Sequence, residues 1–134
     1  MKQILKHPLL RFALVGGIGF LVDMSSFALL SHWLDYAVAR GLAFWIATSS
    51  NWWWNRHFTF AQQNKAAIVE WLQFLGGSIV AFVPNMICYV ILNQLDAMQH
   101  LAFGHYIALV PGVLLGMMIN YSLSRYWIFS SPPA

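Results

Sequence analysis

Two charged residues, Asp23 and Arg40, lie inside apolar runs of this 134-residue chain, which indicates a functional or structural role for each. Asp23 follows Arg11 by a span that would cover about 18 Å of helix at about 1.5 Å per residue. A carboxylate in such surroundings is costly unless it is paired, hydrated or protonated, and it often marks a functional site. Arg40 lies about one turn into the next apolar run. We predict an Asp23–Arg40 ion pair that lines a polar cavity, with a purely structural pairing between helices as the alternative.

Asparagines recur at positions where they could serve the same cavity. Asn85 directly follows Pro84, which cannot donate a backbone hydrogen bond and so frees a carbonyl in mid-helix. An amide side chain donates and accepts hydrogen bonds, which suits hydroxyl groups of a ligand. Asn51 and Asn120 each lie just inward of an arginine. We predict that all three asparagines line the cavity; hydrogen bonding between helices is the alternative.

Arg56 and Arg125 are the arginines that follow Asn51 and Asn120. A guanidinium is always charged and grips a phosphate through two parallel hydrogen bonds, so both arginines are predicted phosphate-binding residues. The alternative is anchoring at the cytoplasmic membrane face. Trp52 and Trp53 are the predicted aromatic lining, stacked on a ligand ring or packed against a lipid chain, with an interfacial aromatic belt as the alternative.

The composition shows what must position these residues. The chain is 60% hydrophobic and 8% charged, against about 45–50% and about 25% in a soluble domain. So short a chain cannot hide that much apolar material from water. A soluble globule, a disordered chain and a disulfide scaffold are excluded, and the net charge of +3 does not suggest nucleic acid.

Sequence motifs for catalysis are missing. We find no Gly-rich phosphate loop, no His-Glu-x-x-His and no nucleophile elbow. Cys88 is the single cysteine, and the histidines show no metal-ligand spacing. We therefore expect no enzyme, no metal, no cofactor and no hydrolysis of ATP.

Four apolar runs approach the roughly 20 residues that a helix needs to cross a membrane. They cover about residues 9–30, 36–54, 70–92 and 105–123. The sequence predicts an all-α membrane protein in which residues 1–134 form a single domain of four transmembrane helices. One side would hold Lys2, Lys6, Arg11, Arg56, Lys65 and Arg125, and the other Arg40 alone. This bias predicts that both termini are cytoplasmic.

The chain also repeats itself. A shift of 62 residues places Asp23 on Asn85, and a shift of 69 places Asn51–Phe60 on Asn120–Phe129. Each repeat holds two spans, so the repeats are parallel and related by an axis near the membrane normal, as in some transporters. A four-helix bundle leaves little interior, which makes a homodimer plausible.

The chain resembles the GtrA-like family of small membrane proteins. The resemblance rests on the opening Arg11–Gly16, on Asp23, and on the two endings Asn51–Phe60 and Asn120–Phe129. It implies translocation of a polyprenyl-phosphate-linked sugar, typically undecaprenyl phosphate glucose, from the cytoplasmic to the periplasmic leaflet of the bacterial inner membrane. The sugar would then modify O-antigen or another surface polymer.

Two alternatives to a translocase stay open. The first is a scaffold that transports nothing and holds a membrane glycosyltransferase near its lipid substrate. The second is a small multidrug exporter, in which Asp23 would bind a cationic drug. The internal repeat and the paired arginine endings argue against the exporter.

Overall fold

The structure, a computed structural model, describes residues 7–60 and 65–130, and the regular structure in these ranges is helical. The long helices are α1 (Pro8–Leu30), α2 (Tyr36–Trp54), α3 (Ala67–Asn93) and α5 (Gly104–Leu123). Each begins and ends within about three residues of a predicted run. The short α4 (Asp96–His100) between α3 and α5 was not predicted. Lys2 and Lys6 lie outside the described residues.

Three helical stretches are long and apolar enough to cross a membrane among the described residues. They are Pro8–Leu30, Ala67–Asn93 and Ile107–Ile128. The chain is thus an all-helical, multi-pass membrane protein. Helix α2 falls short of the prediction, because it carries Arg40 and a polar run over residues 48–51 that lower its hydropathy.

Apolar side chains face outward on the long helices. Examples of strongly exposed ones are Phe20, Leu21, Val38, Leu72, Val80, Ile91, Val110 and Val113. Such a surface is expected where lipid tails replace water, since helices that satisfy their own backbone groups can present apolar side chains all round.

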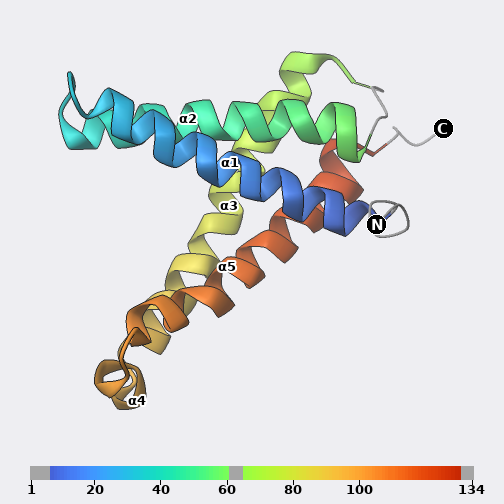
Figure 1. Ribbon diagram of the computed structural model, residues 1–134. Coiled ribbons are helices and arrows are strands. Elements are labelled where there is room, and N and C mark those ends of the chain that lie inside the picture. Colours follow the sequence, from blue (N-terminus) through green and yellow to red (C-terminus); the bar gives the residue numbers. More distant parts are fainter. Residues whose placement is uncertain (1–6, 61–64, 131–134) are drawn as a thin grey trace.

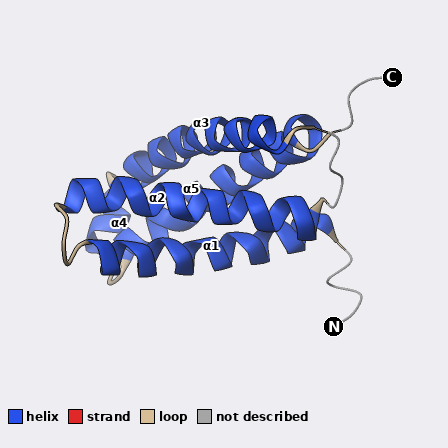
Figure 2. Ribbon diagram, turned by 90° about the horizontal axis from the view of Figure 1, so that it is seen from above, coloured by secondary structure: helices blue, strands red, loops and turns tan. Residues whose placement is uncertain are grey.

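The long helices pack as two pairs. Helix α1 lies along α2, and α3 lies along α5. In Figure 1 the pairs cross near the start of α1 and the end of α5, then diverge toward the α1–α2 turn and toward α4. Figure 2 shows α2 between α1 and α3, and α2 and α3 are in contact. The two pairs therefore hold together mainly at one end.

A hydrophobic core made mostly of aromatic side chains, called the aromatic core below, fills this common end. Its buried members are Phe12, Phe74, Tyr121, Ile128 and Phe129, with Trp52 and Phe60 packed against them. The rings of Phe60 and Phe129 stack with centroids 4.9 Å apart and planes 14° apart. These two residues are equivalent under the 69-residue shift. Equivalent side chains thus meet face to face where the pairs join.

Both repeated endings finish in a π-helical turn, η2 (Asn55–Thr59) after α2 and η3 (Ser124–Ile128) after α5. The Phe60 N–H donates to the Asn55 carbonyl and the Phe129 N–H to the Ser124 carbonyl, each at 2.9 Å. These hydrogen bonds occupy equivalent positions under the 69-residue shift. Neither π turn was predicted from the sequence.

A cation caps each π turn. The Arg11 guanidinium donates to the Phe58 carbonyl at 3.1 Å. The Lys65 ammonium donates to the Trp127 carbonyl at 2.5 Å and to that of Ile128 at 3.0 Å. Phe58 and Trp127 are again equivalent. Cations are favourable at helix C-termini, where carbonyls lack intrahelical partners.

Candidate functional site

A cavity of about 240 Å³ lies between the two helix pairs, next to the aromatic core. Three predicted residues line it: Asn51 from α2, Asn85 from α3 and Asn120 from α5. Asn55 and Ser78 also line it and were not predicted. Both helix pairs thus contribute polar side chains to the wall of the cavity.

Two of these asparagines hold amide oxygens that lack partners. The Oδ1 atoms of Asn51 and Asn120 are buried and make no hydrogen bond among the described residues. The Asn120 amide nitrogen donates to the Ser78 hydroxyl at 3.4 Å. A buried acceptor without a donor costs about 1–3 kcal/mol, and most buried polar atoms find partners. These two oxygens therefore lack the donors that buried acceptors usually have.

Glycines bring the helices close to these side chains. A Cβ atom added at Gly19 of α1 would lie 2.0 Å from the Asn51 Oδ1 atom, so Gly19 makes the room that the amide occupies. A Cβ added at Gly112 of α5 would lie 2.6 Å from the Asn85 carbonyl oxygen. Small residues allow such close helix contact.

Phenylalanines, not tryptophans, form the aromatic wall of this cavity: Phe12, Phe44, Phe74 and Phe82. Trp52 packs against the aromatic core instead. Trp53 is 48% exposed, and its ring lies 4.6 Å from that of His57. The predicted aromatic lining by Trp52 and Trp53 is thus not found here, because these side chains point toward other neighbours.

The structure contains the ion pair expected between α1 and α2. Arg40 Nη2 lies 2.8 Å from Asp23 Oδ2, with the two side chains 52% and 15% exposed. Arg40 lines a second hollow of about 320 Å³, which shares Phe44 and Phe82 with the asparagine cavity. The pair therefore lies beside the asparagine cavity, and Asp23 is not on its wall.

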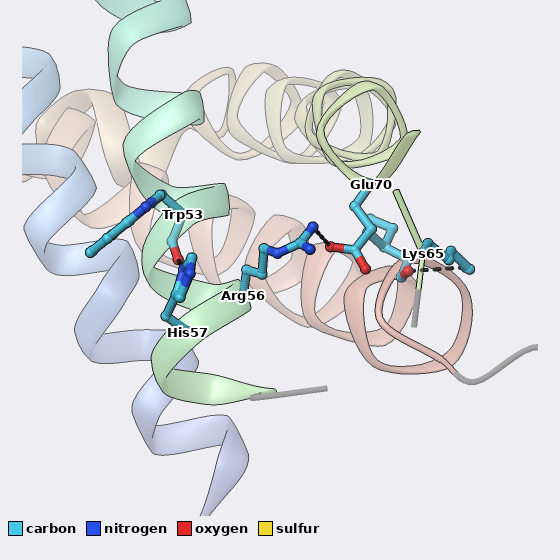
Figure 3. A network of polar contacts seen from close by, with 6 residues as sticks. Trp53, Arg56, His57, Lys65 and Glu70 are labelled. Carbon is cyan, nitrogen blue, oxygen red and sulfur yellow. Dashed lines mark hydrogen bonds and ion pairs between the residues drawn. The ribbon is translucent and has the colours of Figure 1, made fainter. Parts of the chain in front are cut away.

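Arg56 is engaged in a way that the sequence did not reveal. Its Nη1 atom lies 2.5 Å from Glu70 Oε2, and the side chains are only 10% and 1% exposed (Figure 3). The Arg56 guanidinium also lies 5.7 Å from the centre of the Trp52 ring. Arg56, which was predicted to bind a phosphate, thus forms a buried ion pair that joins η2 to α3.

Glu70 is the site residue most clearly missed by the sequence analysis. It is the only glutamate in the chain, and it stands in the first turn of an apolar span. An isolated carboxylate at such a position is a signal for a buried cationic partner. The partner itself comes from tertiary packing and not from spacing.

Arg125, the repeat equivalent of Arg56, is exposed. Its Nη1 atom donates to the Tyr121 hydroxyl at 2.8 Å, and its guanidinium lies 5.5 Å from the centre of the Tyr126 ring. Arg125 lines a third hollow, of about 300 Å³, together with Pro8, Thr59, Phe60, Phe129 and Ser130.

The described residues bring no three His, Cys, Asp or Glu side chains together as a metal site. What the fold and the cavity define is a multi-pass helical membrane protein with a polar chamber between two helix pairs. The chain belongs to the family described as GtrA/DPMS, transmembrane domain, whose model matches residues 11–129. Membership in this family is consistent with a membrane protein that acts on polyprenyl-phosphate sugars. No curated protein matches the chain.

Proposed function

We propose that this protein moves a polyprenyl-phosphate-linked sugar from the cytoplasmic to the periplasmic leaflet of a bacterial inner membrane. Undecaprenyl phosphate glucose is the leading candidate, and modification of O-antigen or another surface polymer is its proposed use. One observation carries the proposal: the cavity between the helix pairs is lined by three asparagines, two of which hold buried amide oxygens without partners. These oxygens would accept hydrogen bonds from sugar hydroxyls as the sugar leaves water.

The cavity needs to shelter only the polar end of such a lipid. Its volume of about 240 Å³ corresponds to roughly eight water molecules at about 30 Å³ each. The isoprenoid tail would stay among lipid tails outside the helices. Phe44 and Phe82 border the cavity toward the Arg40 hollow, so they form the apolar part of the path.

Alternating access would come from movement of one helix pair against the other. In this proposal α2 also crosses the membrane, which makes four spans in total. The two helix pairs are parallel repeats, and both termini are cytoplasmic. The matching π turns, their matching cationic caps and the Phe60–Phe129 stack support the repeat.

We also propose that no covalent chemistry accompanies this movement. The energy would come from the gradient of the lipid, from an ion, or from consumption of the product. The multidrug alternative requires a carboxylate that is available to a cationic drug. The contact of Asp23 with Arg40 already supplies a cation there, which disfavours that alternative.

The test is translocation in liposomes that carry polyprenyl-phosphate glucose, with the accessibility of the sugar followed on each side. Asn51→Leu and Asn120→Leu should each lower the protein-dependent rate at least tenfold, because the sugar loses an acceptor. Ser122→Leu is the control: Ser122 lies on the same helix as Asn120, but its side chain is exposed and bonds only to its own helix. Unchanged rates in both asparagine variants would contradict the proposal.

A further inference from the structure

We infer that the phosphate of the lipid binds at Arg125, in the hollow between the two π turns, and that Arg56 takes no part in phosphate binding. This inference rests on the proposed function for the identity of the lipid. It differs from the expectation that the two arginines act alike, because the structure gives them different surroundings.

Arg56 is not available to a phosphate. Its guanidinium is buried against the carboxylate of Glu70 and beside the Trp52 ring. A phosphate could bind there only by displacing Glu70, which is itself 1% exposed and would be left buried without its counter-charge. Arg56 therefore joins the two helix pairs and does not serve a ligand.

The internal repeat shows what is missing beside Arg125. The 69-residue shift places Arg56 on Arg125, and the 62-residue shift places Pro8 on Glu70. Pro8 lines the same hollow as Arg125. The position that holds a carboxylate beside one arginine thus holds an uncharged residue and an open space beside the other. An anionic ligand in that space would take the place of the carboxylate.

The hollow has the chemistry that a phosphate requires. Arg125 donates one hydrogen bond to Tyr121, out of the five N–H donors of a guanidinium. No acidic side chain is among the described residues that line the hollow. Phe60 and Phe129 form an apolar wall, against which the chain attached to the phosphate could lie.

The neighbouring cations already have other roles. Arg11 and Lys65 donate to the carbonyls of Phe58 and Trp127, the equivalent positions of the two π turns. These contacts hold the ends of the two π turns. Thr59, Phe60 and Phe129, which lie at these ends, line the hollow. Arg125 is therefore the guanidinium that the two endings present to a ligand.

The test is equilibrium binding of undecaprenyl phosphate, without a sugar, to the purified full-length protein in nanodiscs. Inorganic phosphate is measured in parallel. Arg125→Gln should weaken binding of the lipid at least tenfold, and Arg125→Lys should weaken it less, because a point charge remains without the planar fork. The double variant Arg56→Met/Glu70→Leu should bind within about threefold of the unchanged protein.

A second pair of variants places the missing carboxylate in the hollow. Pro8→Glu should lower the affinity at least tenfold more than Pro8→Gln, since both variants lose the proline and only one adds a negative charge. Pro8 is the first residue of α1, where a proline contributes no hydrogen bond that the replacements could lose. This comparison does not require removal of Arg125.

The outcomes separate this inference from the proposed function. Equal binding by Arg125→Gln and the unchanged protein, or equal losses in the two Pro8 variants, would overturn the phosphate site. Binding of inorganic phosphate with no tighter binding of the lipid would overturn the assignment to a lipid. Arg125-dependent binding by a protein that moves no sugar lipid would contradict the translocase and support the phosphate site.

Discussion

The two helix pairs share a plan and use their polar residues differently. In the α1–α2 pair a charged couple, Asp23 and Arg40, joins the helices. The α3–α5 pair has Asn85 at the equivalent place, pressed against Gly112 and Gly116. One pair is joined by an ion pair and the other by close backbone contact.

The two endings, Asn51–Phe60 and Asn120–Phe129, also share a backbone plan and differ in their polar contacts. Arg56 reaches across to Glu70 of the other pair, whereas Arg125 bonds within its own segment and borders an open hollow. The backbone features are kept in both: a π turn, a cationic cap and a terminal phenylalanine. The two endings therefore share their backbone features and differ in the contacts of their arginines.

The buried ion pair offers the strongest way to disturb this asymmetry. Glu70→Ala should destabilise the protein by about 3–5 kcal/mol, because Arg56 would remain buried without a counter-charge. The free energy of unfolding can be measured by titration with SDS in mixed micelles. The double variant Arg56→Met/Glu70→Leu should recover most of the loss. A single variant as stable as the unchanged protein would show that the pair is not a structural element.

The close contact between α3 and α5 gives a smaller effect. Gly112→Ala should cost about 1–3 kcal/mol, because its new Cβ meets the Asn85 carbonyl and the helices must move apart. Gly76→Ala of α3 is the matched control, since nothing lies within 4 Å of a Cβ there. The same SDS titration applies. Equal effects at both glycines would indicate that helix propensity, and not the contact, is responsible.

Removal of the cationic caps should have the smallest effect on the free energy of unfolding, and the effect should be similar for the two π turns. Lys65→Met and Arg11→Met should each cost about 0.5–1.5 kcal/mol, because each removes a charged donor from carbonyls at the end of a π turn. Hydrogen exchange at Phe60 and Phe129 would report which turn loosens. Loosening of both turns by either variant would mean that the endings form one unit.

Much of this architecture could be predicted from the sequence. Apolar runs locate the long helices, and α2 begins and ends where predicted. The Asp23–Arg40 contact follows from two charges at matching depths in consecutive helices. Asn51, Asn85 and Asn120 line one cavity, and their contact with a sugar stays a prediction.

The remaining features depend on information that a single sequence does not display. A π turn differs from an α-helix by a one-residue shift in hydrogen bonding, for which no residue type is a marker. The Arg56–Glu70 pair depends on how η2 meets α3, which is a matter of tertiary packing. The choice of phenylalanine over tryptophan for the cavity wall also depends on which way each helix is turned.

Phe60 and Phe129 meet at one end of the molecule, so a small rotation of one helix pair about this contact moves the far end of that pair by a larger distance. A 19-residue helix such as α2 is about 29 Å long at about 1.5 Å per residue. A rotation of about 10° at the stacked rings would therefore carry the far tip through about 5 Å, one turn of helix. A movement of this size would change the separation between the α1–α2 turn and α4.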